Sequence, residues 1–176
     1  MTGTTTTAAR TTLVHTTVES PLGELLLVGR ASDTAPGGTA LVSLSMPGQK
    51  GGAVVQGGWV RDDTAFTAIA RQLDAYFAGA LTDFAIEYAE GAGTDFQRKV
   101  WHALDSVPYG TTTTYGQLAA GLGLSRAAVR ALGTAIGRNP LLVVRPCHRV
   151  IGADGSLTGY AGGLDRKRRL LDLESA

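Results

Sequence analysis

Residues 114–150 read TYGQLAAGLGLSRAAVRALGTAIGRNPLLVVRPCHRV and combine the pattern of two short helices with a cluster of reactive side chains. Thr114 and Gln117 have the spacing of a capping box, which satisfies the first free N–H groups of a helix. The box predicts a short helix to about Ala120, followed by a tight Gly-rich turn at 121–124. A further helix beyond this turn would complete a helix-turn-helix, although most such patterns belong to simply packed helix pairs.

The second helix, expected over Ser125–Ile136 with Ser125 as its N-cap, has two unlike faces. Apolar side chains at i, i+3 and i+7 are expected to face the core, namely Val129, Leu132 and Ile136. The opposite face has small side chains, arginines and no acidic residue: Arg126, Ala127, Arg130, Ala131, Gly133, Thr134, Gly137 and Arg138. Small side chains permit close approach, and arginines contact phosphates or enter a base stack. This favours nucleic acid as partner; the alternative is close packing on another helix with solvated arginines.

The helix ends at an Asn-Pro pair, and the apolar run Leu141–Val144 that follows is expected to be buried. It leads to Cys147, the only cysteine, which lies between the cation of Arg145 and the imidazole of His148. Neighbouring positive charge or a histidine base lowers the pKa of a thiol and makes it nucleophilic. The histidine needs an orienting acceptor, for which we favour Glu174 over Asp154, Asp165 and Asp172. The alternative is an inert buried cysteine.

The chain before this region is predicted to fold as a small α/β unit over residues 11–90, with 91–176 as a helical second unit. The expected elements are a hairpin of 13–18 and 24–28, a strand at 40–45, a Gly-rich loop at 47–58, a helix at 64–78, a strand at 84–88, a helix from the capping box Thr94–Gln97 to Val107, and a last helix at about 165–174. Residues 1–10 read as a disordered tail. The first unit holds no cluster of reactive groups, so we expect it to support the second.

Composition excludes several classes of protein. Apolar residues make up 44% and charged residues 18%, as in globular chains. The longest aliphatic runs are four residues, far short of the ~20 that span a membrane. A single cysteine excludes a disulfide framework and a multi-cysteine zinc site. Residues 1–90 carry a net charge of −4 and residues 91–176 a net charge of +5, so the second half is the candidate for a polyanionic partner.

The residues resemble the O6-alkylguanine-DNA alkyltransferases, also called methylated-DNA–protein-cysteine methyltransferases. The resemblance covers about residues 94–174. Its motifs stand in the family's order: Thr114-Tyr115-Gly116, Arg130-Ala131-Leu132-Gly133, Asn139-Pro140, Pro146-Cys147-His148-Arg149-Val150, Gly159-Tyr160-Ala161-Gly162-Gly163, Lys167, Leu170-Leu171 and Glu174. It implies an α+β protein, in which a ribonuclease-H-like N-terminal α/β domain precedes a helical C-terminal domain with a helix-turn-helix. The turn before Arg130 is one residue longer than is usual in the family.

The resemblance also implies roles for single residues. Cys147 would take the alkyl group from a guanine flipped out of the duplex, with His148 as base acting through a water and Glu174 orienting it. Tyr115 would give a proton or a hydrogen bond to the departing guanine. Arg130 would fill the gap that the flipped nucleotide leaves. The helix-turn-helix would bind DNA through Arg126, Arg130, Ala131, Gly133 and Tyr115. Asn139 would hold the turn near the active site, the Val150 carbonyl and Tyr160 would help to line the base pocket, and Gly162 would line or support it.

The implied reaction is direct-reversal repair of O6-alkylguanine, and of O4-alkylthymine, in double-stranded DNA. The thioether product has no carbonyl that water could attack, so each molecule is expected to react once and to need neither cofactor nor metal. We expect a cytoplasmic monomer without membrane association. Two other functions remain open: a non-catalytic protein that binds alkylated bases, which the presence of Cys147 argues against, and a cysteine hydrolase.

Overall fold

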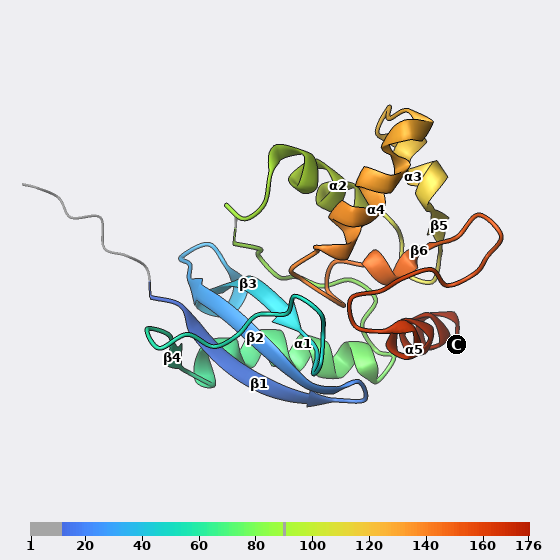
Figure 1. Ribbon diagram of the computed structural model, residues 1–176. Coiled ribbons are helices and arrows are strands. Elements are labelled where there is room, and N and C mark those ends of the chain that lie inside the picture. The colour runs from blue at the N-terminus through green and yellow to red at the C-terminus, as the bar shows by residue number, and fades with distance from the viewer. Residues whose placement is uncertain (1–11, 90) are drawn as a thin grey trace, which may run out of the picture.

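The computed structural model describes residues 12–89 and 91–176, and the predicted tail at residues 1–10 lies outside the described residues. The N-terminal part is built on a mixed sheet with the strand order β3-β2-β1-β4 (Figure 1). Its strands are β1 (Val14–Ser20), β2 (Gly23–Ala31), β3 (Thr39–Ser45) and the two-residue β4 (Val60–Arg61). β4 runs parallel to β1 and was not predicted, because two residues are too few to show a strand pattern.

The predicted hairpin is confirmed. β1 and β2 pair antiparallel, with Val18 opposite Leu25 and Ser20 opposite Gly23. The Ser20 hydroxyl donates to the Gly23 carbonyl oxygen at 2.7 Å and accepts from the Leu22 N–H at 3.1 Å, which closes the turn. The predicted third strand is also present, as β3, which pairs with the far side of β2.

The strand predicted at Phe84–Tyr88 is wrong. Only a single bridge forms there, between Tyr88 and Leu41 of β3. Upstream of this bridge, the backbone of Ala85 pairs with a side chain of helix α1 (Thr67–Phe77). The Gln72 amide oxygen accepts from the Ala85 N–H at 2.7 Å, and the Gln72 amide nitrogen donates to the Ala85 carbonyl at 3.1 Å. The side-chain amide thus occupies hydrogen-bonding groups that a neighbouring strand would need.

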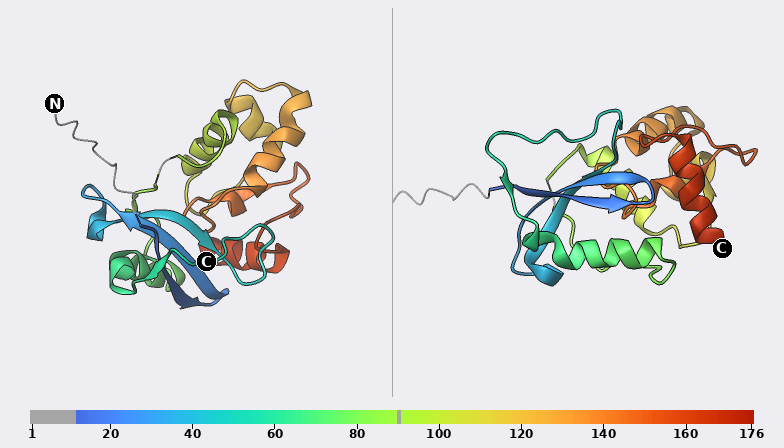
Figure 2. Two further views of the ribbon diagram at one scale, coloured as in Figure 1. Left: turned by 60° about the vertical axis from the view of Figure 1, so that its left-hand side comes forward. Right: turned by 90° about the horizontal axis from the view of Figure 1, so that it is seen from below.

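Helix α1 covers one face of the sheet, and the Gly-rich segment after β3 lies on the other side (Figure 2). The helix is preceded by a 3₁₀ turn at Thr64–Phe66, so together they fill the range predicted for one helix. Its buried side chains join those of the sheet in the core that also receives the C-terminal part: Leu25, Leu27, Leu41, Leu44, Phe66, Ile69, Leu73 and Tyr76.

The C-terminal part is mainly helical. Its helices are α2 (Asp95–Asp105), α3 (Tyr115–Gly121), α4 (Val129–Gly137) and α5 (Leu164–Ser175), and the short strands β5 (Thr113–Thr114) and β6 (Val150–Ile151) pair in parallel. Both predicted capping boxes are confirmed, at the starts of α2 and α3. The Trp101 indole N–H of α2 donates to the Ala135 carbonyl of α4 at 2.9 Å, which fixes these two helices against each other.

The predicted side-chain cap at Ser125 is wrong. A 3₁₀ turn, Arg126–Ala128, comes before α4, and the Ser125 side chain makes no capping hydrogen bond. Instead, the Ser125 carbonyl accepts from the Ala128 N–H at 3.0 Å. The tighter i→i+3 pattern satisfies the backbone without the hydroxyl, and α4 begins at Val129, later than predicted.

The two parts are joined by backbone pairing and by α5. Leu44 at the end of β3 forms a parallel bridge with Leu141, which continues the N-terminal sheet into the C-terminal part. At the same end of β3, where the turn before β2 also lies, the Arg166 guanidinium of α5 donates to the carbonyls of Leu22 at 3.0 Å and Pro47 at 2.8 Å. Among the described residues, no helix combines the length and the apolarity that a membrane span requires.

We predict that Gly29→Ala destabilises the fold by about 1–3 kcal/mol. Gly29 lies at the irregular point of the β2–β3 register, where an added Cβ would lie 2.9 Å from the Ala40 carbonyl oxygen and 2.7 Å from the Thr39 methyl. Gly121→Ala is the matched control, because a Cβ at this helical position meets nothing and should stabilise by up to ~1 kcal/mol. Urea unfolding of both variants measures the difference, and equal stability of the two would contradict the prediction.

Candidate active site

Cys147 lies on a 3₁₀ turn, Cys147–Arg149, at the end of the segment that pairs with β3. The Asn139 side chain brackets this segment. Its amide oxygen accepts from the Leu141 N–H at 3.0 Å, and its amide nitrogen donates to the Arg145 carbonyl at 3.2 Å. Within the bracket, Val143 has a φ of 69°, which a β-branched residue adopts only under constraint. Asn139 therefore holds the backbone that places Cys147, which is the role that the resemblance implies for it.

The thiol of Cys147 is buried, with 4% of the residue exposed. Burial raises the pKa of the thiol to about 11, even though the Asn139 side chain and the charges of Lys167 and Arg145 lower it in part. The expectation that neighbouring cations leave Cys147 with a lowered pKa is therefore wrong. Arg145 has the smallest effect of these, and its guanidinium is paired with Asp105, at 3.1 Å from Nε to Oδ1.

His148 follows Cys147 directly and is completely buried. Its Nε2 lies 2.7 Å from Oε2 of Glu174, while its Nδ1 has no hydrogen-bond partner among the described residues. Burial lowers the pKa of His148, against the hydrogen bond and charge of Glu174, which raise it. The imidazole is therefore neutral at neutral pH. Because Glu174 is an acceptor, Nε2 carries the proton, and the Nδ1 lone pair is free to accept one.

Glu174, near the end of α5, is the acceptor that the structure places at His148, rather than Asp154, Asp165 or Asp172. Asp154 bonds Ser156 instead, and Asp165 and Asp172 are exposed. Burial alone would raise the pKa of Glu174, but hydrogen bonds from His148, Arg149 and Tyr76 outweigh it and lower the pKa to about 2. The carboxylate is thus ionised, buried and available to orient and stabilise a charged imidazole.

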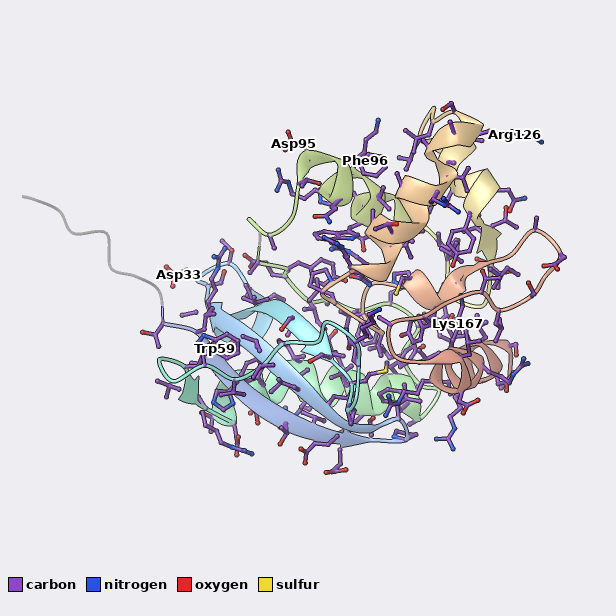
Figure 3. The ribbon with its side chains drawn as sticks, viewed as in Figure 1. Asp33, Trp59, Asp95, Phe96, Arg126 and Lys167 are labelled. Carbon is purple, nitrogen blue, oxygen red and sulfur yellow. The ribbon has the colours of Figure 1, made fainter. Side chains whose placement is uncertain are left out.

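Two further charged residues of this site were not assigned a role from the sequence. Arg149 donates to Glu174 through Nε at 2.7 Å and Nη2 at 3.0 Å, and to the Val107 carbonyl at 2.6 Å. Lys167 is fully buried between α5 and the strand that follows the cysteine turn, where Figure 3 labels it. Its Nζ donates to the Val150 carbonyl at 2.6 Å and the Gly159 carbonyl at 3.1 Å. The sequence offered only one sign that these two residues belong to the site, namely that each stands in a motif of the family. An isolated Arg or Lys otherwise indicates a solvated surface.

The residues predicted for the base pocket lie close to this network. The Tyr160 hydroxyl is buried and has no hydrogen-bond partner among the described residues. Gly162 is packed so closely that an added Cβ would lie 2.5 Å from the Met46 sulfur and 2.9 Å from the Tyr160 ring. The Val150 carbonyl, predicted to line the pocket, already accepts the short hydrogen bond from Lys167.

The residues predicted to bind DNA lie on the outer side of α3 and α4. Arg126, Arg130 and Ala131 are exposed, and Figure 3 shows Arg126 at the outer tip of the C-terminal part. Gly133 is half-buried, and a Cβ there would lie 3.9 Å from the Tyr115 ring. The Tyr115 hydroxyl donates to the Thr158 carbonyl at 2.9 Å, so it is tied to the loop between β6 and α5. Within 12–89 and 91–176, there is no group of three or more His, Cys, Asp and Glu side chains that could hold a metal ion.

Comparison with known families matches both parts of the chain. Residues 13–89 match the family model for the 6-O-methylguanine DNA methyltransferase ribonuclease-like domain, and residues 95–176 match the DNA-binding domain of the same family. The chain belongs to the 6-O-methylguanine DNA methyltransferase family. The family and the α+β fold inferred from the sequence are therefore confirmed.

Several members of this family are similar over nearly the whole chain. A methylated-DNA–protein-cysteine methyltransferase of Mycolicibacterium paratuberculosis is 49% identical over 160 residues, covering 91% of each chain. One of Methanosarcina acetivorans is 47% identical, covering 90% of this chain and 96% of the other. The crystal structure of Mycobacterium tuberculosis OGT in complex with DNA has a TM-score of 0.80 and 45% identity, with 92% of each chain covered.

For this family member we predict that the free protein shows no thiolate titration between pH ~5 and ~9. The raised pKa of Cys147, about 11, keeps the thiol protonated in that range. Because Cys147 is the only cysteine, the ultraviolet absorbance of the thiolate reports on it alone, with Cys147→Ser as the blank. A titration step near neutral pH would show that the protein activates the thiol before substrate binds.

Proposed function

We propose that this protein repairs DNA by moving the alkyl group of O6-alkylguanine, and of O4-alkylthymine, onto Cys147 in a single turnover. The observation that carries the proposal is the buried contact of His148 with Glu174, 2.7 Å long, directly beside the only thiol of the chain. Two further observations support it: an exposed helix surface with arginines and without acidic residues, and relatives that are methylated-DNA–protein-cysteine methyltransferases.

The resting state has a protonated thiol and a neutral imidazole. Because the pKa of Cys147 is about 11 and that of His148 is lowered, the equilibrium lies against the thiolate. The proton therefore leaves sulfur only as transfer proceeds, passing through a water to the free Nδ1 of His148. Glu174, ionised at neutral pH, stabilises the imidazolium that forms.

The bond changes are those of a direct displacement. Sulfur attacks the alkyl carbon, the S–C bond forms, and the bond between that carbon and O6 of guanine breaks. The leaving guanine takes up a proton or hydrogen bond from Tyr115. For this the Tyr115 hydroxyl exchanges its hydrogen bond to the Thr158 carbonyl for one to the base. The imidazolium of His148 then returns the proton of the thiol to Tyr115 through solvent, so that the products are the thioether, guanine and a neutral imidazole. The alkyl donor is the lesion itself, so the reaction requires no cofactor and no metal.

The remaining predicted residues are proposed to give the protein access to the lesion. The small side chains of α4, Ala131 and Gly133, permit close approach to duplex DNA, and Arg126 contacts phosphate. Arg130 enters the stack where the flipped nucleotide was. Asn139, Val150, Tyr160 and Gly162 form or support the wall of the base pocket. We further propose that the chain divides into units 11–90 and 91–176 and acts as a cytoplasmic monomer.

Two other functions make different predictions in one experiment, in which the protein is incubated with duplex DNA carrying an isotopically labelled O6-methylguanine. Transfer gives label bound covalently to protein, up to one label per molecule. A non-catalytic binding protein leaves the label on DNA. A cysteine hydrolase releases a small labelled product with repeated turnover.

We predict that Cys147→Ser abolishes transfer of the label while the affinity for damaged duplex stays within a few-fold of wild type. The alcohol ionises far less readily than the thiol, of reference pKa ~8.5, yet it preserves the shape of the site. The labelled assay and a DNA-binding titration measure the two effects. Appreciable transfer by the serine variant would reject Cys147 as the nucleophile.

We predict that Arg130→Ala slows single-turnover repair of saturated duplex by at least ~10-fold, because extrusion of a base costs a few kcal/mol. Reaction with free O6-alkylguanine, which needs no extrusion, should change little. Arg126→Ala is the comparison: as a phosphate contact, it should weaken binding to damaged and undamaged duplex alike and leave the saturated rate near that of wild type. A saturated rate equal to that of wild type for Arg130→Ala would show that Arg130 does not enter the base stack and only contacts phosphate, as proposed for Arg126.

A further inference from the structure

The N-terminal part reaches the active site through one side chain, Tyr76 of α1. Tyr76 is completely buried, and its hydroxyl lies 2.6 Å from Oε2 of Glu174, 98 residues further along the chain. This is the same carboxylate oxygen that His148 contacts at 2.7 Å. A residue of the first unit thus shares an acceptor atom with the imidazole proposed as the base.

The direction of this hydrogen bond follows from the charges. Burial and the neighbouring Glu174 raise the pKa of Tyr76 far above its ordinary value, so the phenol keeps its proton and donates. The pKa of Glu174 is about 2, so the carboxylate accepts. Oε2 receives Tyr76, His148 and the Nη2 of Arg149, whereas Oε1 receives the Nε of Arg149.

The position of the phenol is fixed by aromatic packing. The Tyr76 ring lies 5.2 Å from the Phe84 ring, 5.3 Å from the Phe77 ring and 6.2 Å from the Tyr109 ring, measured between centroids. The Arg149 guanidinium lies over the Tyr109 ring, 5.7 Å from its centroid. Besides His148, Glu174 is held by Tyr76 and Arg149, and both of these pack in one aromatic cluster. Helix α1 supplies two rings of that cluster, Tyr76 and Phe77.

We propose that Tyr76 is a positioning residue for alkyl transfer: its hydroxyl fixes Oε2 of Glu174 against the Nε2–H of His148 and takes up part of the carboxylate charge. The proposal rests on the transfer function proposed above. It gives the N-terminal part a role in the chemistry, since donors from α1 and from the cysteine turn meet on one oxygen atom.

The expected effect on pH dependence has a definite sign. The charged and titratable groups that face His148 are Glu174 and Lys167 from α5, and Arg149 and Cys147 on its own turn; Tyr76 on α1 faces it through Glu174. Without the phenol, Glu174 keeps more negative charge at Oε2. That charge raises the pKa of His148, and because the base must be neutral, the acid limb of the rate profile moves to higher pH.

The test uses Tyr76→Phe, which keeps the ring and removes only the hydroxyl. The single-turnover rate on saturating damaged duplex is measured from pH ~5.5 to ~9. We expect a rate about 10-fold lower at neutral pH, from the loss of one hydrogen bond to a charged group. We also expect an acid limb at higher pH, and unchanged affinity for DNA.

Tyr88→Phe is the matched control. Tyr88 also belongs to the N-terminal part, is half-buried, and donates its hydroxyl to a backbone carbonyl, that of Val144, at 3.2 Å. Its removal also costs one phenolic hydrogen bond, to a neutral acceptor, without touching Glu174, so the pH profile should match wild type. Equal effects of the two variants on rate and profile would mean that Tyr76 acts only through stability and would overturn the proposal.

Two further measurements separate positioning from other causes. In a Glu174→Gln background, Tyr76→Phe should have no additional effect on the rate, because Tyr76 acts through that carboxylate; additive effects would overturn the proposal. Replacing Tyr76 by 3-fluorotyrosine preserves the packing and strengthens the donor, so the acid limb should move to lower pH. An unchanged limb would count against the proposal even if Tyr76→Phe folds poorly.

The proposal can also fail separately from the proposed function. Nitrogen-15 NMR of histidine-labelled free protein reports the pKa of His148 without any substrate, and we expect a higher value in Tyr76→Phe than in Tyr88→Phe. An identical value would overturn the role of Tyr76 while wild-type protein still transfers label from DNA. If wild-type protein transfers no label, the proposed function fails, and the NMR comparison still decides whether Tyr76 sets the imidazole.

Discussion

The buried carboxylate of Glu174 is the interaction on which the rest of the molecule depends. An ionised group without partners would be very costly in this interior, so each surrounding element contributes a donor. The cysteine turn supplies His148 and Arg149, and α1 supplies Tyr76. Because these donors come from both parts of the chain, the packing of α5 between them and the geometry of the active site are determined together.

The second constraint is the burial of the thiol. A cysteine that is shielded from water and has a pKa of about 11 is a poor nucleophile toward solutes in general. It becomes effective where a base and an electrophilic carbon are held in line with it, so that the proton leaves as the new bond forms. Burial thus protects a residue that can be used only once. It also disfavours the thiolate, which therefore forms only during the reaction.

The sequence was most informative where local chemistry decides the structure. The two capping boxes, the hairpin around 20–23 and the buried run 141–144 follow from hydrogen-bonding groups and periodicity within a few residues, and all are present. Errors arose where distant residues compete. Gln72 occupies the backbone of Ala85 and prevents a strand, and the burial that raises the pKa of Cys147 is a property of the assembled core. The contact of Tyr76 with Glu174 joins residues 98 positions apart, and no local pattern indicates it.

The bridges at Leu41 and Leu44 affect more than the placement of Cys147. β3 is an edge strand, and its free side is partly occupied by Tyr88 and by Leu141, from segments on either side of α2. Exposed strand edges offer backbone groups to other chains and promote association. The segment that carries the reactive cysteine is therefore also a cover for the sheet. A chain that ended before this segment would keep the bridge at Tyr88 but leave β3 unpaired at Leu44, where its backbone could pair with another chain.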